Sequence, residues 1–177
     1  GYDATTMQDI ATAAGLNKSS LYHHIRGKEE LLEAICQRAF ATLNGSLEQA
    51  ETSAAGPGRR VMQAFAGAVS TALGDPRGTS IIIRLQGKTE VSRLARGWRR
   101  DYEQRFAALI EVAQKAGEMR ADISALMLAR LVLGQVDWLV EWYEPRGDSY
   151  PVSAVEAAVV AVAAHGLAGE GGHLTAE

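Results

Sequence analysis

Apolar and polar residues follow one another along this chain with the period of an α-helix. Helices are expected at about 7–14, 18–25, 28–51, 58–73, 80–86, 89–116, 122–143 and 152–169. Segment 80–86 carries a β-branched run that also suits a strand, but no partner strand is predicted, so we assign it to a short helix. The predicted fold class is therefore all-α, with a compact N-terminal unit on a larger helical bundle.

The first two predicted helices are short and are joined by a glycine turn. Thr6 and Asp9 form a capping-box pattern at the start of the first helix, and Asn17 can cap the second. Gly15 suits the left-handed backbone that ends the first helix, and the small Ala11 would lie where the helices cross. The second helix would be anchored by the apolar residues Leu16, Leu21 and Ile25. This arrangement indicates a helix-turn-helix.

The same stretch resembles the DNA-binding half of the TetR family of transcriptional regulators. The resemblance covers GYDATTMQDIATAAGLNKSSLYHHIRGKEEL, in which the Thr-Thr, Ile-Ala, Ala-Gly-Leu, Ser-Leu-Tyr and Gly-Lys-Glu-Glu-Leu elements have the family's spacing. It implies a DNA-binding domain over 1–45 and a ligand-binding and dimerisation domain over 46–177. Family members carry a further amphipathic helix before the Gly-Tyr pair. This first helix is missing from the chain, so we expect the apolar face of the helix-turn-helix to be partly uncovered.

The second helix would lie in the major groove of DNA, with its N-terminal half nearest the bases. The side chains expected to face DNA are Lys18, Ser19, Ser20, Tyr22 and His23. Thr6 and Lys28 begin the flanking helices, where a phosphate can bind near the N-terminus. Packing is an alternative role for Tyr22 and ordinary solvation for His23, whereas His24 is expected to be structural. We expect no zinc site, because adjacent helical histidines point about 100° apart and no further ligand is suitably spaced.

The formal net charge of the chain is −3, so contact with DNA would depend on a local patch. Within residues 1–30, the basic Lys18, Arg26 and Lys28 are set against Asp3, Asp9, Glu29 and Glu30. Such a unit would bind DNA weakly alone. We therefore predict a homodimer that reads a palindromic operator, with half-sites about 34 Å apart or at a multiple of that spacing.

The last two predicted helices are the candidate dimer interface. Alanine and valine occupy nearly every face of AVEAAVVAV, so another helix could approach closely. The preceding helix offers an apolar stripe formed by Leu126, Ala129, Leu133, Val136 and Val140. A purely intramolecular core is the alternative, but the resemblance to the family, whose members dimerise in this way, favours the interface.

Residues 58–144 are expected to enclose a ligand pocket, although a place in the plain core is the alternative for each candidate. The candidates are Met62, Phe65, Trp98, Tyr102, Phe106, Gln135 and Trp138, with Leu94 and Leu109 as further wall. The segment GQVDWLVEWYEPRGDSYPVSAVEAA resembles TetR-type regulators of lipid and acyl-CoA metabolism. Arg93, Arg96 and Arg100 share a helical face that could hold the phosphates of a CoA-type ligand, or simply be solvated and paired with nearby acids.

Composition narrows the functional class. The single cysteine, Cys36, leaves no internal disulfide and suits a cytoplasmic protein, and no apolar run reaches the ~18 residues of a membrane span. No Ser-His-Asp or metal-ligand spacing is present, which argues against an enzyme, and we expect no cofactor and no membrane partner.

We therefore predict a dimeric TetR-type repressor that is released from its operator by a small apolar or acyl-CoA-like effector. One alternative is a helix-turn-helix interaction protein without ligand control. The other, less favoured, is an all-α enzyme acting on acyl esters.

Overall fold

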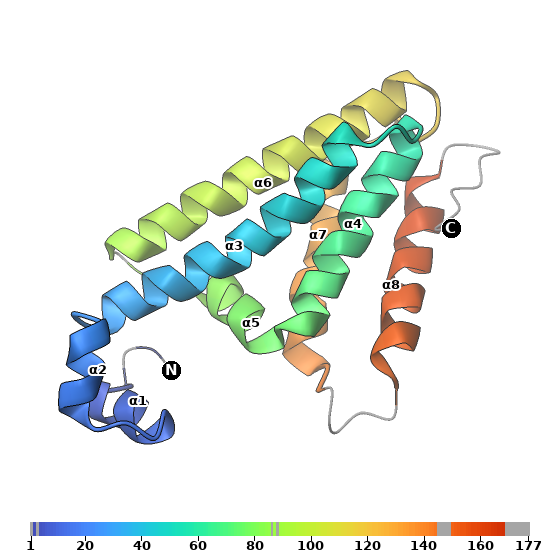
Figure 1. Cartoon of the computed structure of the whole chain (residues 1–177). Helices are drawn as coiled ribbons and strands as arrows, with labels where there is room; N and C mark the ends of the chain where they lie inside the picture. Colours follow the sequence, from blue (N-terminus) through green and yellow to red (C-terminus); the bar gives the residue numbers. More distant parts are fainter. Residues whose placement is uncertain (1, 3, 86, 88, 145–149, 169–177) are drawn as a thin grey trace.

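The computed structural model describes residues 2, 4–85, 87, 89–144 and 150–168 of the 177-residue chain. The described residues form eight α-helices (Figure 1). Their bounds are α1 Met7–Ala13, α2 Lys18–His24, α3 Lys28–Thr52, α4 Pro57–Gly74, α5 Pro76–Arg84, α6 Glu90–Lys115, α7 Ala125–Trp142 and α8 Val152–Leu167. The all-α prediction is confirmed, and each predicted helix has its counterpart among these eight.

The first two helices begin as their sequences predict. The backbone N–H of Thr6 donates to Asp9 Oδ2 at 2.8 Å, and the N–H of Asp9 donates back to Thr6 Oγ1 at 3.2 Å. This is the reciprocal capping box at the start of α1. Asn17 Oδ1 accepts from the N–H of Ser20 at 2.7 Å and so caps α2.

The start of α5 is fixed by a capping side chain and that of α8 by a proline. α5 begins at Pro76, earlier than expected, because Asp75 caps it by accepting from the N–H of Gly78 at 2.9 Å. α8 begins at Val152, as predicted; Pro151 is its cap residue, and no side chain caps this helix. Pro151 is extended (ψ 148°), so the helix begins at the residue that follows it.

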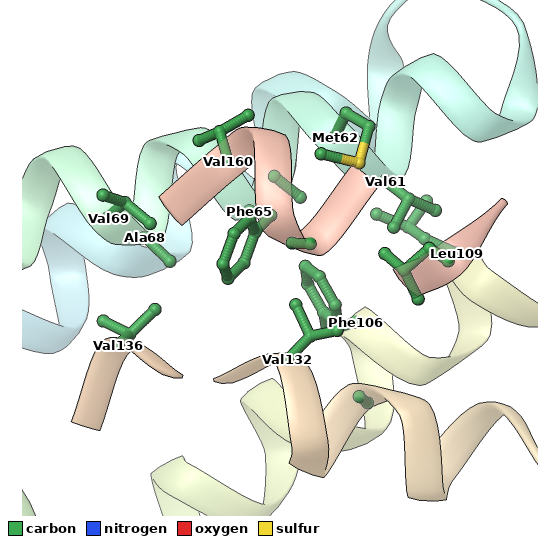
Figure 2. Packing of buried hydrophobic residues seen from close by; sticks show 14 of the residues in the cluster. Val61, Met62, Phe65, Ala68, Val69, Phe106, Leu109, Val132, Val136 and Val160 are labelled. Carbon is green, nitrogen blue, oxygen red and sulfur yellow. The ribbon is translucent and has the colours of Figure 1, made fainter. Parts of the chain in front are cut away.

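The larger part of the molecule is a bundle built around α4, which packs against α3, α6, α7 and α8 (Figure 1). Figure 2 shows Phe65 of α4 and Phe106 of α6 pointing into the middle of the main apolar cluster, and both are fully buried. α1 and α2 pack against each other beyond the bundle (Figure 1). None of the helices described is both long and apolar enough to cross a membrane.

α3 connects the two parts of the molecule without a break. The domain boundary expected at residue 45 lies inside this helix, which ends only at Thr52. The far end of α3 is fixed to α6 by the Arg105 guanidinium, which donates to both carboxylate oxygens of Glu51 at 2.7 and 3.1 Å and to Asn44 Oδ1 at 3.0 Å. α3 is therefore held firmly on the bundle at one end and carries the short helices at the other.

Candidate nucleic-acid interface and ligand cavity

The helix-turn-helix depends on a glycine in the turn and on two buried apolar residues where α1 and α2 meet. Gly15 adopts a φ of +67°, as the turn requires. Ala11 is fully buried and Leu21 is nearly so, which confirms both as packing residues. Leu16 was expected to turn inward but is 43% exposed, because Ala11 and Leu21 already fill the contact between α1 and α2.

α2 presents a polar face to solvent. Lys18, Ser19 and His23 are exposed, and Ser20 is half-buried. Tyr22 is 47% exposed, and the Lys18 ammonium lies 6.0 Å from the centroid of its ring. Exposure favours an outward role for Tyr22 over the packing alternative.

His24, the last residue of α2, is more exposed than expected. His24 was expected to be structural in a crowded turn, but it is exposed, since it lies in the last turn of α2 where few side chains surround it. Within the described residues, no group of three or more His, Cys, Asp or Glu side chains could hold a metal ion.

Thr6 and Lys28, the two predicted phosphate contacts outside α2, make internal bonds. The Thr6 hydroxyl donates to Asp9 Oδ2 at 2.7 Å, and its hydrogen bonds lower the pKa of the Asp9 carboxyl. An anionic carboxylate therefore already lies at the start of α1. The Lys28 ammonium donates to the carbonyl oxygens of Tyr2 and Thr5 at 2.7 and 3.0 Å and lies 4.4 Å from the Tyr2 ring centroid. Lys28 thus fastens the N-terminal segment to the beginning of α3.

A cavity of about 310 Å³ lies between α3, α4, α5, α6 and α7. Most of its wall is apolar and includes Phe40, Leu43, Ala68, Ile82, Ile83 and Leu133. Thr79 and Tyr102 add two hydroxyl groups, and four charged side chains complete the wall: Arg99, Glu103, Arg130 and Asp137. An apolar cavity with a few polar groups is typical of a small-molecule site.

The four charged side chains form one continuous network between α6 and α7. Arg99 pairs with Glu103 (Nε to Oε1, 3.6 Å) and hydrogen-bonds to Asp137. Arg130 approaches the other oxygen of Glu103 at 3.3 Å. The pKa of the Asp137 carboxyl is raised overall, chiefly by burial. The charge and hydrogen bond of Arg99 act to lower this pKa, and the nearby charge of Glu103 acts to raise it.

Tyr102 is the most unusual polar residue on the cavity wall. It is 5% exposed, and its hydroxyl has no hydrogen-bond partner among the residues that the structure describes. Burial raises the pKa of this phenol, which therefore stays protonated. Its ring stacks on Phe106, with centroids 6.5 Å apart. A buried hydroxyl without a partner is rare enough in native proteins to need an explanation.

The structure separates the predicted ligand-binding residues into four groups. Tyr102 lines the cavity. Met62, Phe65 and Phe106 lie in the packed core instead, because they are on the faces of α4 and α6 that pack into the bundle. Trp98 packs edge-to-face on Phe40, with centroids 5.4 Å apart, behind the cavity wall. Gln135 and Trp138 line a separate surface groove. Of the further wall residues, Leu109 is in the core and Leu94 is 38% exposed.

The arginine face on α6 does not converge on the cavity. Arg93 pairs with Glu90 at 2.9 Å, and Arg96 donates to the carbonyl of Gly87 at 2.9 Å. Arg100 is exposed. The charged network of the wall was not predicted, although the four-residue spacing of Arg99 and Glu103 is a signal for one of its pairs. The other partner of Arg99, Asp137, lies 38 positions further along the chain.

α7 and α8 present an apolar groove to solvent. The groove is lined by Leu131, Gln135, Trp138, Trp142, Val159 and Val162, among others. Trp138 is 67% exposed and Val162 66%. Most of the stripe predicted for this interface faces inward: Ala129 and Val136 are buried in the core, where α7 packs against α4 and α6, whereas Leu126 is exposed.

An exposed helix-turn-helix joined by one helix to a helical bundle is the architecture of a DNA-binding regulator. Residues 1–35 match the family model for bacterial regulatory proteins of the tetR family, and residues 57–167 match the tetracyclin repressor-like C-terminal domain. The chain belongs to the TetR family, whose members are transcription factors and not enzymes.

Individual relatives agree with this assignment. The HTH-type transcriptional repressor KstR2 of Mycolicibacterium smegmatis is 27% identical over 159 residues, which are 87% of this chain and 75% of that protein. A TetR-family regulator from Streptomyces coelicolor is 33% identical with a TM-score of 0.83, over 92% of this chain and 82% of that one. AibR, solved with isovaleryl coenzyme A and operator DNA, shares the fold at 24% identity and a TM-score of 0.77, over 92% and 88% of the two chains.

Proposed function

We propose that this TetR-family repressor is a homodimer that binds a palindromic operator through α2 and is released by an effector held in the cavity. The observation that carries the proposal is the course of α3. This helix begins at Lys28, directly after the helix-turn-helix, and its middle places Phe40 and Leu43 on the cavity wall. A ligand that favours one position of these side chains therefore biases the orientation of the DNA-binding unit, which is the differential binding that allostery requires.

The proposed DNA contacts follow from the exposed face of α2. Ser19, Ser20 and Tyr22 can donate to phosphate oxygens, and Lys18 and His23 can reach phosphates or base edges. Thr6 and Lys28 are proposed to lie at the edges of this interface, where their internal bonds fix the backbone that faces the phosphates.

Dimerisation is proposed to use the outer faces of α7 and α8. Trp138, Trp142 and Val162 are exposed apolar side chains on a groove that a second copy of the same two helices can fill. A patch of this kind marks an interaction surface, and two copies together double the number of DNA contacts that one helix-turn-helix makes.

The proposed effector is a small apolar molecule or the acyl part of an acyl-CoA-like ligand. The cavity volume of about 310 Å³ is at the lower end of the range for small-molecule sites, so a nucleotide portion would lie outside it. The AibR complex with isovaleryl coenzyme A and operator DNA shows that a protein of similar fold combines both kinds of ligand. A repressor acting on the chromosome would work in the bacterial cytoplasm.

Fluorescence anisotropy with DNA from the protein's own promoter tests the proposal. Lys18→Ala should weaken sequence-specific binding by ~1–3 kcal/mol per half-site and reduce its salt dependence. Lys115→Ala, which removes the same charge from the exposed end of α6, is the matched control and should leave affinity unchanged. Full-length protein without sequence-specific, salt-dependent binding would instead support an interaction protein.

A further inference from the structure

Each cation on the cavity wall is already paired with a carboxylate. Within the described residues, the wall carries two arginines, Arg99 and Arg130, and two acids, Glu103 and Asp137. Both arginines contact Glu103, and Arg99 also contacts Asp137. The charges cancel, and the two acid side chains are the less exposed half of the network, at 18% for Glu103 and 33% for Asp137.

Resting on the effector site proposed above, we propose that Asp137 makes this cavity selective for ligands whose polar group is an uncharged carbonyl, and that it excludes free carboxylates. A carboxylate that reached Arg99 would have to displace Asp137 and leave that acid partly buried without its partner, which is costly. The displaced acid and Glu103 would also repel the ligand.

An uncharged carbonyl meets neither obstacle. It can enter without opening the network, and the wall offers it uncharged donors. Thr79 is buried beside the cavity, and Tyr102 has a buried hydroxyl without a partner. A hydroxyl in this state gains a hydrogen bond at little cost when an acceptor arrives. The two halves of the wall therefore favour the same class of ligand, an apolar body carrying an amide, ester or ketone group.

Isothermal titration calorimetry with two nearly isosteric probes tests the assignment. 4-Phenylbutanamide and 4-phenylbutanoate differ in charge but hardly in size. The wild-type protein should bind the amide at least about tenfold more tightly than the carboxylate. Asp137→Asn keeps the shape of the side chain and removes its charge, so it should shift this ratio towards the carboxylate by about tenfold.

Glu141→Gln is the matched control. Glu141 lies one turn further along α7 and pairs with Arg84 (Nε to Oε1, 2.9 Å), but it is not on the cavity wall, so its loss should leave the ratio unchanged. Asp137→Ser gives a second removal of the charge if the asparagine variant folds poorly, and circular dichroism reports the fold of each variant.

Three results would overturn the proposal: equal binding of the two probes by the wild type, an unchanged ratio in both Asp137 variants, or no binding of either probe. Because these titrations contain no DNA, they are independent of the repressor proposal. Failure of operator binding would refute that function and leave the selectivity of the cavity intact.

Discussion

Trp138→Glu is expected to abolish the proposed dimer. Trp138 is 67% exposed at the centre of the α7–α8 groove. A tryptophan buries up to about 250 Å², so covering the exposed two-thirds removes about 165 Å² from water and contributes about 4 kcal/mol per protomer at about 25 cal/mol/Å². If a partner covers only half of that area in each copy, the two tryptophans together still contribute about 4 kcal/mol. That corresponds to about a thousandfold change in the dimer dissociation constant, and two facing glutamates would add repulsion.

Sedimentation equilibrium in the analytical ultracentrifuge measures this change directly. Val112→Glu is the control, because Val112 is also an exposed apolar residue (47%) but lies on α6, outside the groove. The variant at Val112 should dimerise like the wild type. A Trp138→Glu protein that dimerises with unchanged affinity would refute the assignment of this face, and so would equal dissociation of both variants.

Three further outcomes follow from the buried and capping residues. Phe65 is fully buried in the core, so Phe65→Ala should lower the free energy of unfolding, measured by urea denaturation, by ~3–5 kcal/mol. The preference for the uncharged probe should stay intact, and an altered preference would instead place Phe65 on the ligand site. The hydrogen bonds of Thr6 lower the pKa of Asp9, so the capping box should stabilise α1 at pH values above the ordinary pKa of aspartate and be lost as the pH falls through the lowered pKa. NMR of the Thr6 and Asp9 amides can follow this loss, and amide signals that do not change with acid would contradict it. Burial, with Glu33, raises the pKa of Cys36, so its thiol should resist Ellman's reagent at neutral pH until the protein unfolds, and fast native labelling would disagree.

Local chemistry explains why the helices could be predicted. The capping box at Thr6, the left-handed Gly15 and the cap at Asn17 each act over a few residues, so the sequence contains the whole interaction. Pro76 was harder to assign, because a proline is compatible both with a loop and with the first turn of a helix, and Asp75 decided between them.

Which face of a helix is buried could be predicted less well. α7 is apolar on several sides, so its period does not say whether Val136 or Trp138 faces the core, and α4 and α6 settle the question in favour of Val136. The charged wall of the cavity was missed for a related reason. Charged residues on a helix are ordinarily solvated, and the pairing of Arg99 with Asp137 depends on how α6 and α7 pack.

Because α3 is unbroken, its length sets the rotation of the DNA-binding unit about the helix axis. Each residue of a helix advances the axis by about 1.5 Å and turns it by about 100°. One residue inserted between Lys28 and Phe40 would rotate the whole DNA-binding unit by about 100° relative to the cavity, while seven would restore its heading to within about 20° but displace it by about 10 Å. The number of residues in this stretch is therefore constrained independently of which side chains they carry. The number of α3 residues between the helix-turn-helix and the cavity therefore fixes the direction in which α2 points.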